Sequence, residues 1–187
     1  MPLDGIRESK MGMIMTFLPW LVFWVLLSYG KLFTAIVVAL AASVAAIVME
    51  KMSGRTPKIL QIGTLAVFVV FAVAAAFVDR AWLGYWIRLM SNAALTLIVF
   101  VSILIGKPFT IQYARESVPK EYWTSAEFLH ANYVITWVWF AAFLANTAAS
   151  GLNHLIPSIN VLVNWMIAIC PILAAAKFTA WYSKRGK

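Results

Sequence analysis

Histidine and cysteine are the side chains that most readily hold a transition metal or a haem, and this chain has only His130, His154 and Cys170. The two histidines lie on either side of one apolar segment, where a helix would separate them by about 36 Å at about 1.5 Å per residue. The single cysteine lies inside another apolar segment and allows no disulfide within the chain. We therefore expect no metal, haem or other cofactor.

Carboxylates are common agents of acid–base catalysis, but here they are scattered outside the apolar segments. No two of the seven form a pair within such a segment; they are Asp4, Glu8, Glu50, Asp79, Glu116, Glu121 and Glu127. A G-x-S-x-G sequence, which would place a nucleophilic serine on a sharp turn, does not occur. The sequence therefore favours a protein that is not an enzyme.

Amides and prolines are the candidates for a role inside the apolar segments. Asn146 and Asn164 would lie at membrane depth, where an amide needs a partner on another helix. Pro19 and Pro171 interrupt two segments, and broken helices often mark the binding sites of carriers. Proline kinks are also tolerated in membrane helices, so a substrate site and simple helix–helix bonding both stay open.

The longest polar segment, residues 106–123, has the sequence GKPFTIQYARESVPKEYW. Its two prolines favour a short amphipathic helix at the membrane surface, with Phe109, Tyr113 and Ile111 toward the membrane. A candidate interaction surface follows from its other side chains: Lys107, Pro108, Gln112, Arg115, Lys120 and Trp123. A solvated connector with aromatic anchors would have the same composition, so both interpretations stay open.

The composition indicates whether this protein lies in water or in a membrane. Hydrophobic residues make up 63% of the chain and charged residues 12%, and the mean hydropathy is +0.86. A soluble domain carries about a quarter charged residues, so this chain is expected to be an integral membrane protein. The net charge of +8 is scattered between apolar segments and forms no basic stripe, so we expect membrane lipids and not nucleic acid as partners.

Six apolar segments come close to the roughly 20 residues that cross a ~30 Å hydrocarbon core. They cover about residues 11–29, 32–49, 59–78, 87–105, 133–152 and 161–182. The sequence predicts an all-α polytopic membrane protein forming one domain over residues 1–187. It would have five to six transmembrane helices and a short cytoplasmic amphipathic helix between the fourth and fifth. Thr124 and Glu127 have capping-box spacing, so the fifth helix should begin near Ser125.

The distribution of lysine and arginine predicts the orientation. If all six segments span, twelve of the fifteen fall on one side, and only Lys31, Arg80 and Arg88 fall on the other. The positive-inside rule then places both termini in the cytoplasm. The first segment contains Pro19 and could be re-entrant, in which case five segments span and the N-terminus lies on the opposite side.

An ordered set of motifs resembles a known family. FLPWLVFW occupies residues 17–24, GKPFTIQ occupies 106–112, and a lone Trp123 precedes WVWFAAFLAN at 137–146. This order and spacing resemble the intracellular septation protein A family of bacterial inner membranes. The resemblance implies an inner-membrane protein that supports cell septation and envelope integrity through other membrane proteins, with no established catalytic residues.

Two functions therefore remain for this sequence. The first is a non-enzymatic inner-membrane protein of cell division or the envelope, with cytoplasmic anionic lipids and membrane proteins as partners and a homo-oligomer left open. The alternative is a small channel or carrier for a lipid or a neutral metabolite, based on the prolines and the amides in the apolar segments.

Overall fold

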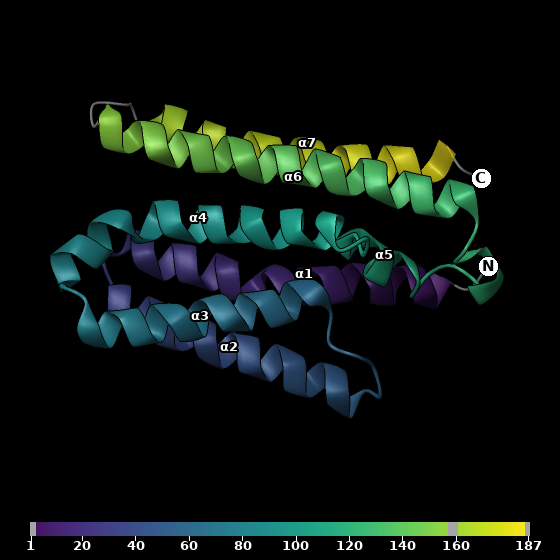
Figure 1. The fold of residues 1–187 in the computed structure, drawn as a ribbon, viewed down its shortest axis with the longest axis horizontal. Coiled ribbons are helices and arrows are strands. Elements are labelled where there is room, and N and C mark those ends of the chain that lie inside the picture. The colour runs from purple at the N-terminus through teal and green to yellow at the C-terminus, as the bar shows by residue number, and fades with distance from the viewer. Residues whose placement is uncertain (1–2, 157–160, 186–187) are drawn as a thin grey trace. The chain divides into compact units, whose positions relative to one another are not determined.

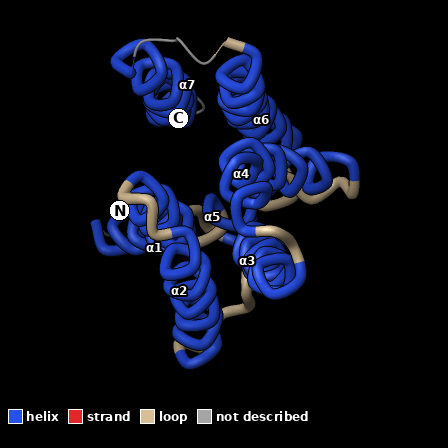
Figure 2. Tube along the Cα trace, turned by 90° about the vertical axis from the view of Figure 1, so that its left-hand side faces the viewer, coloured by secondary structure: helices blue, strands red, loops and turns tan. Residues whose placement is uncertain are grey.

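A computed structural model describes the backbone of residues 3–156 and 161–185, and the side chains of residues 15–156, 166 and 169–183. Every regular element in these ranges is helical, as the tube in Figure 2 shows. The elements are α1 Leu3–Ser28, α2 Leu32–Met52, α3 Ile59–Phe77, α4 Arg80–Leu104, α5 Phe109–Ala114, the 3-10 helix η1 Lys120–Tyr122, α6 Ala126–Leu155 and α7 Val161–Arg185. The prediction of an all-α protein is confirmed.

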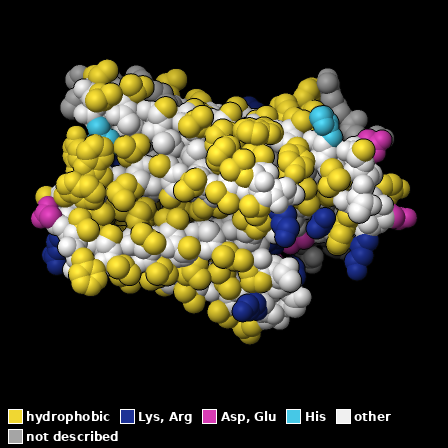
Figure 3. All heavy atoms as spheres, viewed as in Figure 1, with side chains coloured by type: hydrophobic (Ala, Val, Ile, Leu, Met, Phe, Trp, Pro, Cys, Tyr) yellow, Lys and Arg dark blue, Asp and Glu magenta, His cyan; other side chains and the backbone are white. Residues whose placement is uncertain are grey.

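Four of these helices are long and apolar enough to cross a membrane: α2, α3, α4 and α6. Residues 15–28 of α1 form a shorter apolar stretch. On the face seen in Figure 3, hydrophobic side chains cover the middle parts of the helices and charged side chains lie toward their ends. By length and composition, these are the helices of a multi-pass membrane protein.

Three of the helices end in the same way, each at a glycine. Gly30, Gly54 and Gly106 have φ angles of 71°, 69° and 70°, a left-handed conformation that only glycine adopts without strain. The residue after each glycine donates its N–H to a carbonyl five positions earlier, as Lys31 does to Leu26 at 3.2 Å. These are Schellman ends, which satisfy the last carbonyls of a helix and turn the chain sharply.

Two helix starts are set by capping side chains. Asp79 Oδ1 accepts the N–H of Trp82 at 2.8 Å, which starts α4 seven residues before the predicted apolar segment. Ser125 Oγ accepts the N–H of Phe128 at 3.2 Å and caps α6. The predicted start near Ser125 is confirmed, but the cap is the serine itself and not the expected pair of Thr124 and Glu127.

The described chain forms two compact units, residues 1–87 and 88–187, with α4 passing from one into the other. In the first unit, α1, α2 and α3 pack on one another (Figure 1). Trp20 and Phe23 of α1 meet Phe68 and Phe71 of α3, and their ring centroids lie 5.0–6.1 Å apart. On α2 the buried small residues recur every four positions, which allows close helix packing: Ala35, Ala39 and Ser43.

In the second unit, α6 and α7 lie side by side and α5 packs on α6 (Figure 1). Hydrogen bonds join α4 to α6, from Asn92 to Ser150 at 2.7 Å and between the hydroxyls of Thr96 and Thr147 at 2.8 Å. Trp139 Nε1 donates to Thr179 Oγ1 at 3.0 Å and joins α6 to α7. Polar pairs thus hold together helices that share an apolar environment, and the single domain over residues 1–187 stays a prediction.

Candidate functional site

The polar segment that follows α4 is fixed at its start by Ser102. Its Oγ accepts the N–H of Phe109 at 3.2 Å and donates to the carbonyl of Val99 at 2.7 Å. Pro108 is the N-cap residue of α5, with an extended ψ of 130°. The chain therefore leaves α4 through Gly106 and enters α5 along one defined path.

The middle of the segment is fixed by α6. Thr110 Oγ1 lies 3.0 Å from the carbonyl oxygen of Asn132 and 2.7 Å from Thr136 Oγ1. Next to it, the ring of Phe109 meets Trp139 of α6 edge-on, with centroids 6.4 Å apart. These contacts turn one side of α5 toward α6 and bury it.

The burial of α5 differs from the sequence-based expectation. Phe109, Ile111 and Tyr113 were expected to lie toward the membrane, and the structure leaves them only 0%, 6% and 1% exposed. The reason is Thr110, since its hydroxyl bonds to α6 determine which way the short helix is turned. The apolar side chains of α5 are therefore part of the protein interior.

The exposed cations of the segment stand outside this packed part. Lys107, Arg115 and Lys120 are exposed, whereas Gln112 is half-buried and Pro108 is buried. Arg115 stacks over the ring of Trp123, 5.1 Å from its centroid, and Trp123 Nε1 donates to the carbonyl of Val118 at 2.8 Å.

We call Lys107, Arg115, Lys120 and Trp123 the basic surface. Its three cations share the segment with two carboxylates, Glu116 and Glu121. The structure brings Arg115 and Trp123 of the predicted set into contact. It gives Pro108 a role in the turn, since this residue is the buried N-cap of α5.

A second polar cluster, at the turn from α2 to α3, was not found from the sequence. Glu50 and Lys58 are 6% and 4% exposed, and Lys58 Nζ donates to Glu50 Oε1 at 2.6 Å. Arg55 Nε donates to the same oxygen at 3.0 Å, and Gln61 Nε2 donates to Glu50 Oε2 at 3.3 Å. Gln61 Oε1 also accepts the N–H of Lys58 at 2.9 Å. The carboxylate is thus surrounded by donors from residues 55–61, which compensate its charge although it is buried.

Residues 9–185 of the chain match the family described as "Protein of unknown function (DUF3159)". The chain belongs to this family. No curated protein and no solved structure matches it. The family match covers α4, α5 and α6 and therefore includes the basic surface and both of its supporting helices.

The prolines and asparagines predicted to act inside the apolar segments lie on three different helices of this family member. Pro19 is buried within α1 and Pro171 lies within α7, and both helices run through their prolines without a break. Asn146 is 6% exposed on α6, while the side chain of Asn164 lies outside the described residues. The expected helix breaks at the two prolines are therefore not present.

The histidines and the cysteine also stand apart in the described part of the chain. No group of three or more His, Cys, Asp or Glu side chains there could hold a metal ion. His130 is exposed at the start of α6, and Cys170 is exposed on α7.

Proposed function

We propose that this protein is a non-enzymatic, multi-pass protein of a bacterial inner membrane that acts as a docking platform. Its basic surface would contact anionic lipid headgroups and membrane proteins of cell division or envelope maintenance. The observation that carries this proposal is the way the segment is built, because its interior is fixed to α4 and α6 while its cations remain exposed.

A fixed segment is suited to recognition. A preformed surface loses less conformational entropy on binding than a flexible loop does. Each lysine or arginine near an anionic membrane contributes about 1 kcal/mol of attraction, so Lys107, Arg115 and Lys120 together could select anionic headgroups. Trp123 is suited to the same boundary, since tryptophan prefers the interface between water and lipid.

The proposed topology has six spans, formed by α1, α2, α3, α4, α6 and α7, with both termini and the basic surface in the cytoplasm. Twelve of fifteen lysines and arginines on one side support this orientation. In this topology α5 is a short helix at the cytoplasmic surface, covered by α6 and not laid on the bilayer. The link to septation rests on the ordered motifs that resemble the septation protein A family.

The alternative of a channel or carrier keeps one supporting observation, the polar side chains between α4 and α6. Asn92 bonds to Ser150, and Thr96 bonds to Thr147, so these groups already satisfy one another. Bonds of this kind are expected between packed membrane helices. The carrier hypothesis also relied on helices broken at Pro19 and Pro171, but α1 and α7 are continuous. We therefore favour the docking platform.

The experiment is purification of the full chain from its native membranes in a gentle detergent, with mass spectrometry of every protein and lipid that co-elutes. The test variant replaces Lys107, Arg115 and Lys120 with Gln, and the control replaces Lys51 and Lys177, two exposed lysines outside the segment, with Gln. We expect the test variant to lose partner proteins and anionic lipid that the wild type and the control retain. Equal recovery from all three would contradict the proposal.

A further inference from the structure

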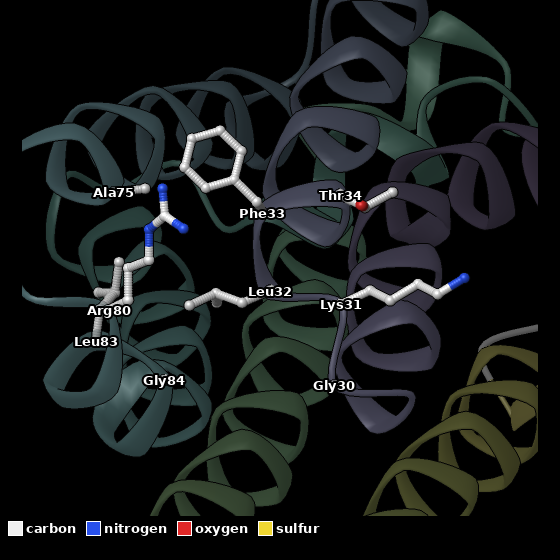
Figure 4. A pocket seen from close by; sticks show the side chains of 9 residues that line it. All are labelled: Gly30, Lys31, Leu32, Phe33, Thr34, Ala75, Arg80, Leu83 and Gly84. Carbon is white, nitrogen blue, oxygen red and sulfur yellow. The ribbon is translucent and has the colours of Figure 1, made fainter.

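A pocket of about 510 Å³ lies at the end of the first unit where α1 turns into α2 and α3 turns into α4. Its walls come from the start of α2, the end of α3 and the first turns of α4 (Figure 4). Gly84 leaves room on the α4 side, since a Cβ atom there would lie 3.8 Å from Leu32 Cδ2 and would clash with nothing. The pocket is therefore open to a ligand group of modest size.

The pocket carries positive charge. Arg80 and Lys31 both line it, and neither forms an ion pair with a described carboxylate. Asp79, the nearest acid along the chain, uses Oδ1 to accept the N–H of Trp82. An anion could therefore approach Arg80 without displacing a salt bridge to a described carboxylate.

Arg80 is the cation that faces the pocket. Its guanidinium lies 5.8 Å from the centroid of the Phe33 ring, and Figure 4 shows it between that ring and Ala75. The ring restrains the guanidinium through a cation–π contact while leaving its N–H donors available, and a guanidinium is well suited to bind a phosphate through two hydrogen bonds. The Lys31 side chain extends in the other direction in Figure 4, so Arg80 is the basic group that the proposal uses.

The surroundings of the pocket are those of a lipid interface. Large apolar side chains beside it are exposed on α2, where Phe33 and Val37 are 52% and 51% exposed, and on α3, where Val73 and Phe77 are 54% and 87% exposed. Three aromatic side chains at this end are at least half exposed, as in an interfacial aromatic belt: Tyr29, Trp82 and Tyr85. A ligand with both an anionic head and apolar chains matches this combination.

We propose that the pocket binds the phosphate of an anionic phospholipid, with Arg80 contacting the phosphate and the acyl chains lying along the exposed apolar sides of α2 and α3. This site is separate from the basic surface, since none of its lining residues belongs to residues 106–123. In the proposed topology the turns after α1 and after α3 lie on the non-cytoplasmic side, so the pocket would serve the outer leaflet.

The test measures how fast a thiol in the pocket reacts with N-ethylmaleimide. Cys170 is the only cysteine, so a Cys170→Ala chain can carry one reporter, either Thr34→Cys in the pocket or Tyr29→Cys at the same end but outside it. Each chain is reconstituted in vesicles of phosphatidylcholine, with or without phosphatidylglycerol. We expect phosphatidylglycerol to slow labelling at position 34 and to leave position 29 unchanged.

Two further substitutions identify the cause of any protection. Arg80→Gln should weaken protection about fivefold, the effect expected for one cation at an anionic surface. Gly84→Leu fills the pocket without changing the charge and should also remove the protection, whereas Arg88→Gln, an exposed arginine further along α4, should leave it intact. Labelling at position 29 in each variant reports whether the helical end is still folded.

Three results would overturn the proposal. The first is equal slowing at both reporter positions, which indicates a general effect of surface charge. The second is full protection in the Arg80→Gln chain. The third is equal protection by inorganic phosphate in phosphatidylcholine vesicles, which would assign the pocket to a free phosphate and not to a lipid.

Discussion

Lys58 Nζ lies 2.6 Å from Glu50 Oε1, and both side chains are buried at the turn between α2 and α3. A buried ion pair contributes little net stability, but removing one partner leaves an uncompensated charge. We therefore expect Glu50→Gln to destabilise the fold by about 3–5 kcal/mol, measured by reversible unfolding of the purified chain in mixed micelles.

The same turn offers a matched control in Arg55, whose side chain is 45% exposed while it bonds the same oxygen. Arg55→Gln should cost only about 0–1 kcal/mol, as exposed ion pairs do. Replacing both Glu50 and Lys58 with Met should be milder than Glu50→Gln alone, since no buried charge is then unpaired. Equal effects of Glu50→Gln and Arg55→Gln would contradict this account of the cluster.

In the core of the first unit a side-chain hydrogen bond joins α1 to α3, from Trp20 Nε1 to Thr64 Oγ1 at 2.8 Å. Both residues are buried, so Thr64→Val leaves an indole N–H without an acceptor and should cost about 1–3 kcal/mol. With Trp20→Phe already present, the same Thr64→Val change should cost much less. Unfolding of the four chains of this cycle gives the coupling, and strictly additive losses would show that the bond contributes nothing.

The helices could be predicted from the sequence because membrane spans need long apolar runs, and the runs at residues 32–49 and 59–78 match α2 and α3 within three residues. The start of α4 at Arg80 could not be predicted from an apolar run, since the first turn contains charged and aromatic residues. The helix starts there because Asp79 caps it. The interruption predicted at Pro19 is absent, because α1 accommodates this proline within one continuous helix.

Side-chain burial was harder to predict than the helices themselves. The orientation of α5 depends on bonds between Thr110 and residues of α6 about 22–26 positions away, which no local pattern encodes. From the sequence, Glu50 is predicted only to lie outside the apolar segments. The nearby Lys58 and Gln61, three residues apart at the start of the next helix, were the available signal for a closed polar turn.

The attachment of α5 to α6 can be tested by hydrogen exchange. Thr110→Val keeps the shape of the side chain but removes its bonds to Asn132 and Thr136, at a cost of about 1 kcal/mol. Amides of residues 109–114 should then exchange about fivefold faster while those in the middle of α6 stay unchanged. Ser117→Ala removes only a hydrogen bond within the segment and serves as the comparison. Unchanged exchange in α5 of the Thr110 variant would contradict the proposed attachment.

The stacking of Arg115 on Trp123 can be tested by limited proteolysis. Trp123→Leu removes both the stacking and the bond to Val118, together about 1.5–2 kcal/mol, so the loop should open about twentyfold more often. Trypsin should then cleave after Arg115 correspondingly faster. Tyr122→Leu, at a neighbouring residue that is 56% exposed, should leave the rate unchanged. A Trp123 variant that is cleaved no faster than wild type would show that the stack does not order the segment.

Both proposals depend on α4 crossing the membrane, so that the basic surface and the pocket face opposite sides. The most direct test is single-cysteine labelling with a membrane-impermeant maleimide, applied to intact spheroplasts and to inverted vesicles. In a Cys170→Ala chain, we predict that Tyr29→Cys reacts only in spheroplasts and that Lys107→Cys reacts only in inverted vesicles. Labelling of both positions from the same side would contradict the account.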